Sequence, residues 1–214
     1  MSTVAYRIFN AYLKAKLRSL GFVKSGALGA IRIRDIFVDR LELQASRWGD
    51  LFYLHHSVTV AADLMIGKSS SYFVGKRLQR GRDDTSWNIC ATNTVEHVFD
   101  SIFNCIDADS LPFFESVSRY QDYLFEIFSD SNFSEKNFSL DSLVAFIGSG
   151  KHDRAFHICT DIMETKFSET RRTEQRHAQL QGYASDLRVS IEAGTCEDLV
   201  EKWKKERISL LVKL

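Results

Sequence analysis

Two runs of alternating apolar and polar residues flank the short segment Arg47-Trp48-Gly49-Asp50. The first run covers residues 36–46 and the second covers residues 51–62. Alternation places successive side chains on opposite faces of a strand, and a polar, glycine-containing segment between two such runs is typical of a β-hairpin. Because each run has one apolar face, the pattern predicts an antiparallel sheet that is covered on one side by helices.

Two polar residues interrupt these apolar faces. Asp39 shares its predicted face with the apolar residues of the first strand, and His56 shares its face with those of the second. The adjacent His55 points to the opposite side, so we expect one histidine to be half-buried in the sheet and the other to lie at the surface. A short alternating run at residues 30–34 predicts a further strand and an antiparallel meander.

Apolar residues at three- and four-residue spacing predict helices over residues 4–20, 94–106 and 111–128, with Ser110 as the N-cap of the third. Beyond about Ser129 the pattern is wholly helical. The predicted fold class is α+β: an antiparallel β-meander sheet with helices packed on one face, followed by an all-helical C-terminal region. We expect residues 1–130 to form the first domain and residues 131–214 to form the helical region.

Composition limits the class of protein. One proline and 16 phenylalanines in 214 residues argue against disorder. No apolar run approaches the ~20 residues that span a bilayer, and the first residues lack the apolar core of a signal peptide. The four cysteines are widely separated and are expected to be buried, reduced thiols. We therefore expect a cytoplasmic protein that does not insert into a membrane.

The net charge of zero conceals an uneven distribution. Residues 1–82 contain 14 lysines and arginines against five acids, whereas residues 83–142 contain two against 12. Such segregation can steer a charged partner to one surface. It also fits basic and acidic segments that face each other inside one domain. We favour the second interpretation, because separation along the sequence is not separation in space.

The motifs that suggest chemistry are incomplete. Residues 62–69 match a permissive phosphate-binding loop, but the residues that follow do not begin a good helix, which disfavours nucleotide binding. His157 and Cys159 are two residues apart and would point to different helix faces, so we expect no metal site and no cofactor. No serine or cysteine lies in the local setting of a nucleophile, and no catalytic residue is assigned.

The loop from Lys68 to Arg82 is basic and contains Tyr72 and Phe73, a composition compatible with nucleic-acid backbones. The zero net charge argues against a dedicated nucleic-acid binder. The candidate binding residues come from the hairpin and from this loop: Arg47, Trp48, Asp50, Tyr53, His55, Lys76, Arg77 and Arg80.

Four short motifs follow one another in the first 128 residues: Leu17…Leu20-Gly21-Phe22, Leu43-Gln44-Ala45-Ser46-Arg47-Trp48-Gly49-Asp50-Leu51-Phe52, Trp87, and Leu111-Pro112-Phe113-Phe114. In this order they resemble the bacterial family labelled domain of unknown function 4304, over residues 4–128. The resemblance implies a small cytoplasmic α+β domain without an established activity, so it transfers no catalytic residue. The chain departs from the family at His55-His56-Ser57, where the family has an asparagine and a glycine, and a site built on that asparagine is not carried over.

Two functions from different classes remain open. The first is a non-enzymatic protein-binding module, of an immunity or regulatory type, supported by the charge segregation and by the turn at Trp48. The second is a small-ligand-binding protein or an enzyme with a pocket on the open face of the sheet, formed by Arg47, Tyr53 and His55. We favour the first, with a protein partner rather than a nucleic acid, and leave the oligomeric state open.

Overall fold

The computed structural model describes residues 9–26, 28–45, 51–62, 74–77, 79–80, 83–84, 86–88, 95–129, 139–165 and 171–212. The described residues form two compact units. The first unit draws on residues 1–59 and 74–118, and the second draws on residues 60–73 and 119–213. The predicted division at residue 130 falls inside the second unit. Among the described helices, none combines the length and the apolar character that crossing a membrane requires.

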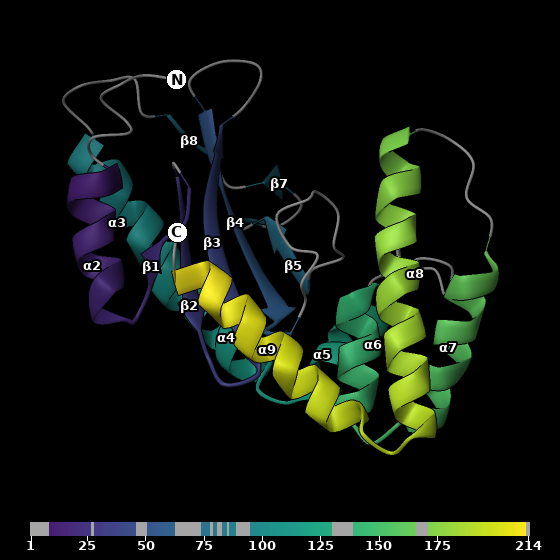
Figure 1. Ribbon diagram of the computed structural model, residues 1–214. Coiled ribbons are helices and arrows are strands. Elements are labelled where there is room, and N and C mark those ends of the chain that lie inside the picture. The colour runs from purple at the N-terminus through teal and green to yellow at the C-terminus, as the bar shows by residue number, and fades with distance from the viewer. Residues whose placement is uncertain are drawn as a thin grey trace. The chain divides into compact units, whose positions relative to one another are not determined.

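A single antiparallel sheet organises the first unit (Figure 1). Its strands follow one another in chain order from β1 to β5, and β8 pairs with β4 as well. The predicted α+β class and antiparallel meander are confirmed. The bounds of these strands are β1 Val23–Lys24, β2 Gly29–Ile33, β3 Phe37–Ala45, β4 Leu51–Val60, β5 Val74–Arg77 and β8 Ser86–Asn88. A separate two-stranded hairpin pairs β6 Gln79–Arg80 with β7 Asp83–Asp84.

The helical segments of the first unit are the π-helical turn η1 Phe9–Leu13, α2 Lys14–Ser19, α3 Val95–Cys105, the π-helical turn η2 Ile106–Ser110 and α4 Leu111–Ser116. One face of the sheet packs against them. Trp87 lies opposite Phe52 in the register of β8 and β4, and its indole N–H donates to the hydroxyl of Ser101 in α3 at 3.1 Å. Gly21 follows α2 with φ of +82°, a left-handed conformation that suits a glycine at the end of a helix.

Two predictions about the helix at residues 111–128 are wrong. Ser110 has helical backbone angles and its side chain makes no capping hydrogen bond, because the chain passes from α3 through η2 into α4 without leaving the helical conformation. The predicted single helix is also interrupted. At Val117 the backbone turns to φ −99° and ψ 77°, which ends α4, and α5 starts only at Tyr120.

The described part of the second unit is almost entirely helical (Figure 1). Its helices are α5 Tyr120–Ser129, α6 Leu140–Gly148, α7 His152–Glu164, α8 Arg171–Glu192 and α9 Cys196–Val212. Helix α6 is buried along its whole length from Leu140 to Ile147, which makes it the centre of this unit. The prediction of a helical C-terminal region is confirmed.

Candidate functional site

Strand β4 presents its side chains alternately to two environments. Phe52, Leu54 and His56 lie on one side of the strand and are at most 5% exposed. Tyr53 and His55 lie on the other side and are half-buried. The prediction that the adjacent histidines point to opposite sides is confirmed, but both are more buried than expected: His56 is 1% exposed and His55 is half-buried rather than at the surface. We call the side of His56 the core face of the sheet and the side of His55 the outer face.

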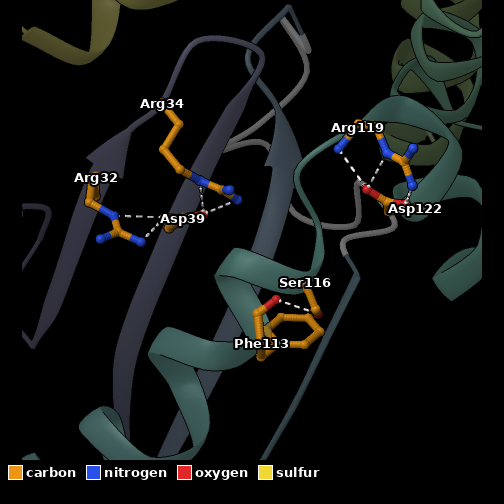
Figure 2. Close-up of polar contacts among 7 residues, drawn as sticks. All are labelled: Arg32, Arg34, Asp39, Phe113, Ser116, Arg119 and Asp122. Atoms are coloured by element: carbon orange, nitrogen blue, oxygen red, sulfur yellow. Dashed lines mark hydrogen bonds and ion pairs between the residues drawn. The ribbon is translucent and has the colours of Figure 1, made fainter.

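A buried carboxylate with two arginines lies on β2 and β3. Asp39 is fully buried. Nε of Arg32 donates to one carboxylate oxygen at 2.8 Å, and Nε of Arg34 donates to the other at 2.9 Å. The Nη2 atoms form ion-pair contacts with the same two oxygens, at 2.8 Å for Arg32 and 2.6 Å for Arg34. Figure 2 shows the two guanidinium groups on different sides of the carboxylate. Each carboxylate oxygen thus has its own charged donor.

Aromatic rings line this ion triad and place it on the core face. The guanidinium of Arg32 lies 5.0 Å from the ring centre of Phe22, a distance at which a cation is attracted to the ring. The ring centre of Phe114 lies 5.8 Å from the guanidinium of Arg32 and 6.0 Å from the ring of His56. Because the triad and His56 share this neighbour, both are on the face that the helices cover.

The electrostatics of Asp39 are dominated by its burial. Desolvation raises the pKa of this carboxyl above its ordinary value, and the charges and hydrogen bonds of Arg34 and Arg32 lower it without cancelling the rise. Arg32 lies directly opposite Asp39 in the register of β2 and β3, so this contact forms only when the two strands are aligned as observed. We conclude that the triad stabilises the fold and is not part of a functional site. The sequence offered a signal for it, because Arg32 and Arg34 alternate along one strand and Asp39 interrupts the apolar face of the next.

His56 is held by contacts from the helical layer. Its Nδ1 lies 3.0 Å from the hydroxyl oxygen of Ser110, and its ring stacks on that of Phe113 with centres 4.5 Å apart and planes 9° apart. A histidine beside a serine hydroxyl also occurs in nucleophilic catalysis. Here, however, Ser110 is fully buried and His56 is 1% exposed, so a substrate cannot reach the hydroxyl. The contact ties η2 to β4.

The outer face carries polar side chains where the β3–β4 hairpin turns. Arg40 and Glu42 form an ion pair with 2.9 Å between Nη2 and Oε2, and their side chains are 38% and 47% exposed. Gln44 is exposed and Tyr53 is half-buried, whereas Thr59, towards the other end of β4, is 5% exposed. We call the set Arg40, Glu42, Gln44, Tyr53 and His55 the hairpin patch.

The register of β5 separates two of the basic residues that were predicted to bind a partner, Lys76 and Arg77. Arg77 lies opposite His55 and therefore belongs to the outer face, whereas Lys76 lies opposite His56 and belongs to the side of the core face. Arg80 is in β6, opposite Asp83 of β7. Of the predicted binding residues whose side chains are described, the structure brings Tyr53 and His55 to one face.

The turn at the tip of the hairpin, with Arg47, Trp48 and Asp50, lies outside the described residues. The same is true of residues 63–70, which contain most of the phosphate-loop match. The basic and acidic segments meet at two described places. Arg80 pairs with Asp83 across the β6–β7 hairpin, and Lys16 lies 3.0 Å from a carboxylate oxygen of Asp100.

Comparison of the chain with protein-family models, with curated proteins and with solved structures finds no match. The resemblance to the family labelled domain of unknown function 4304 therefore stays a prediction. The candidate site has to be judged on the geometry of this chain.

Proposed function

We propose that this protein is a non-enzymatic protein-binding module and that the hairpin patch is its contact surface. The observation that carries the proposal is that Arg40, Tyr53 and His55 are only partly buried and lie on one face of the sheet. Tyrosine and arginine are the residue types that most often supply binding energy at protein interfaces. The opposite face of the same strand is occupied by helices. On the outer face Ser57 and Thr59 are buried, whereas Tyr53 and His55 are half-buried, so the proposed contact surface is confined to the hairpin patch.

The composition of the patch indicates the chemistry of the partner. Arg40 is a cation that pairs with Glu42, and His55 becomes a cation when it is protonated. An acidic protein surface complements such a patch and would be drawn to it by long-range attraction. We therefore expect a partner protein whose contact surface carries carboxylates, and an association that weakens as the salt concentration rises.

Site-specific photo-crosslinking in the producing cell tests this proposal. A benzoylphenylalanine placed at position 55 reports on the hairpin patch, and the same residue at position 107, which is exposed on η2, serves as the control. We expect a crosslinked protein at position 55 that is missing at position 107. The captured protein is then purified and titrated with the full chain.

In that titration the substitutions Arg40→Ala and Tyr53→Ala are each expected to weaken binding by about tenfold or more, which equals about 1.4 kcal/mol. Asp107→Ala is the matched exposed control and should leave the affinity unchanged. Equal crosslinking from both positions, or an affinity that both patch variants leave unchanged, contradicts the proposal. Stabilisation of the chain by a metabolite, lost in Tyr53→Ala, would assign the patch to a small ligand instead.

A further inference from the structure

A cluster of three different metal-ligating side chains lies in the second unit, apart from the hairpin patch. His152 is the first residue of α7, and Cys196 and Glu197 are the first two residues of α9. Nε2 of His152 lies 3.0 Å from Oε1 of Glu197, and the thiol of Cys196 donates to Oε2 of the same carboxylate at 3.2 Å. One nitrogen, one sulfur and one oxygen thus lie within 4.8 Å of one another.

The backbone holds the two helix starts in the same way. Gly150 and Gly194 both have φ of +71° and both stand two residues before a member of the cluster. The residue after each glycine donates its N–H back to a carbonyl five residues earlier, Lys151 to Phe146 at 2.9 Å and Thr195 to Ser190 at 2.8 Å. This is the Schellman arrangement that ends a helix. The ligand-bearing residues therefore begin new helices from two rigid turns, and their positions are set before any ligand binds.

Burial and exposure are distributed as an accessible binding site requires. Cys196 is 2% exposed, whereas the side chains of His152 and Glu197 are 39% and 62% exposed. Nε2 of His152 is itself shielded from solvent. The sulfur thus forms the floor of the cluster, and the carboxylate lies at its solvent side, where an ion could enter.

These donors match one metal better than others. Zinc takes cysteine sulfur at about 2.3 Å and histidine nitrogen or carboxylate oxygen at about 2.1 Å, with tetrahedral geometry, so its ligand atoms stand about 3.4–3.6 Å apart. In the cluster, Nε2 of His152 lies 3.0 Å from Oε1 of Glu197 and Sγ of Cys196 lies 3.2 Å from Oε2, and the ligand atoms all lie within 4.8 Å of one another, so small side-chain movements would bring them to these separations. Calcium and magnesium prefer an all-oxygen shell, which a thiol and an imidazole do not supply.

We propose that His152, Cys196 and Glu197 bind a zinc ion, with the fourth coordination position open to water. Binding replaces the S–H bond of Cys196 by a sulfur–zinc bond, and the proton is released to solvent without a change of oxidation state. Three protein ligands with one open position are the arrangement of zinc sites that act on a bound molecule rather than of closed structural sites.

A catalytic cysteine is the competing assignment for the cluster, and the contacts disfavour it. The thiol donates its hydrogen bond to the carboxylate of Glu197. A catalytic cysteine would instead donate to the imidazole that takes its proton.

Titration of the full chain with cobalt tests the site directly. The protein is stripped with a chelator, and Co²⁺ is added as a spectroscopic probe, followed by displacement with Zn²⁺. We expect one equivalent of Co²⁺ to produce a thiolate-to-cobalt charge-transfer band and the strong visible bands of tetrahedral cobalt, and Zn²⁺ to abolish both.

Substitutions within and beside the cluster separate a built site from incidental binding. Cys196→Ser should remove the charge-transfer band, and His152→Ala and Glu197→Gln should each weaken Zn²⁺ binding by about 100-fold, because losing even an outer-shell partner costs about 10–100-fold. His157→Ala on α7 and Asp198→Asn on α9 are exposed neighbours and serve as matched controls. The proposal is overturned if folded wild-type protein gives no charge-transfer band, or if zinc affinity is the same in Cys196→Ser and in both controls. Circular dichroism verifies the fold of each variant.

Discussion

Each of the two compact units buries one aspartate completely, and the two carboxylates are stabilised by different means. Asp39 in the sheet meets two guanidinium groups, at 2.6–2.9 Å. Asp141 lies in the first turn of α6 and accepts a hydrogen bond from the hydroxyl of Tyr123 at 3.0 Å. In the sheet, two charged arginines stabilise the carboxylate of Asp39. In the helical unit, a neutral hydroxyl and the positive end of a helix dipole stabilise the carboxylate of Asp141.

The difference follows from the geometry of each element. Directly opposite residues of paired strands point to the same face, so a strand can place a cation against an anion at a fixed register. The first turn of a helix has backbone N–H groups without helical partners, and these favour a carboxylate without a second charged residue. Losing a partner should therefore cost more in the sheet than in the helices.

The two units can be followed separately in one experiment. Trp87 is buried in the first unit and Trp203 is buried in the second, at 7% and 4% exposure. Labelling with 5-fluorotryptophan gives each side chain its own fluorine resonance, and urea titration then reports the free energy of unfolding at each site. The first three predictions below are changes in the free energy of unfolding measured at these two resonances.

The largest effect is expected for Asp39→Ala. The substitution leaves Arg32 and Arg34 without their anion in a site where both are largely buried, and it should lower the free energy of unfolding by about 3 kcal/mol at the Trp87 resonance. Asp100→Ala, which removes the exposed partner of Lys16, is the control and should cost less than about 1 kcal/mol. If Asp39→Ala costs no more than this control, the triad does not stabilise the sheet.

Tyr123→Phe should have the next largest effect. It removes the hydroxyl that donates to Asp141 and keeps the buried ring, and a hydrogen bond to a charged group contributes about 2 kcal/mol. The loss should appear at the Trp203 resonance. A loss as large as that of Asp39→Ala would remove the contrast between the two units, and an unchanged midpoint would show that the helix terminus alone holds the carboxylate.

A smaller loss, about 1 kcal/mol, is expected for Ser139→Ala. Ser139 and Ser142 form a reciprocal capping box at the start of α6, in which each side chain accepts from the backbone N–H of the other. Removing the cap should destabilise the helix terminus that supports Asp141. Ser139→Asp restores an acceptor at the same position and should recover most of the loss. Failure of this rescue would show that the serine acts through packing.

The smallest effect is expected when the stability of the wild type is compared with that of Asp39→Asn over a range of pH. Burial raises the pKa of Asp39 in the folded protein, so the folded state holds this proton more tightly than the unfolded chain. The resulting stability is fully present below the ordinary aspartate pKa and is lost as the pH rises through the raised value. As the pH rises from about 3 to about 7, the free energy of unfolding of the wild type should therefore fall relative to that of Asp39→Asn. The opposite slope would mean that the two arginines outweigh the cost of burial.

Local patterns predicted a large part of the fold. The alternation around the Arg47–Asp50 turn placed β3 and β4 within two residues of their observed ends, and the same period separated His55 from His56 correctly. Glycines at positions 21 and 194 follow the ends of α2 and α8, and both have a positive φ. These predictions succeed because strand period and helix termination depend on residues that are neighbours along the chain.

The errors share a different origin. Ser110 has the residue type and the nearby proline of an N-cap, yet its partner is His56, 54 positions away. The nearness of His152 to Cys196 and Glu197 was not anticipated either. Spacing along a helix cannot reveal such pairs, because they form only when separate helices dock.

The amino-acid sequence thus specifies which segments are extended, which are helical and which side chains share a face, because backbone sterics and the periods of strand and helix act over a few residues. It does not specify that Asp39 receives two arginines, that Arg77 aligns with His55 while Lys76 does not, or that an imidazole, a thiol and a carboxylate converge at the starts of α7 and α9. Those outcomes depend on strand register and on helix packing, which are settled by burying apolar surface between segments that are distant in the chain.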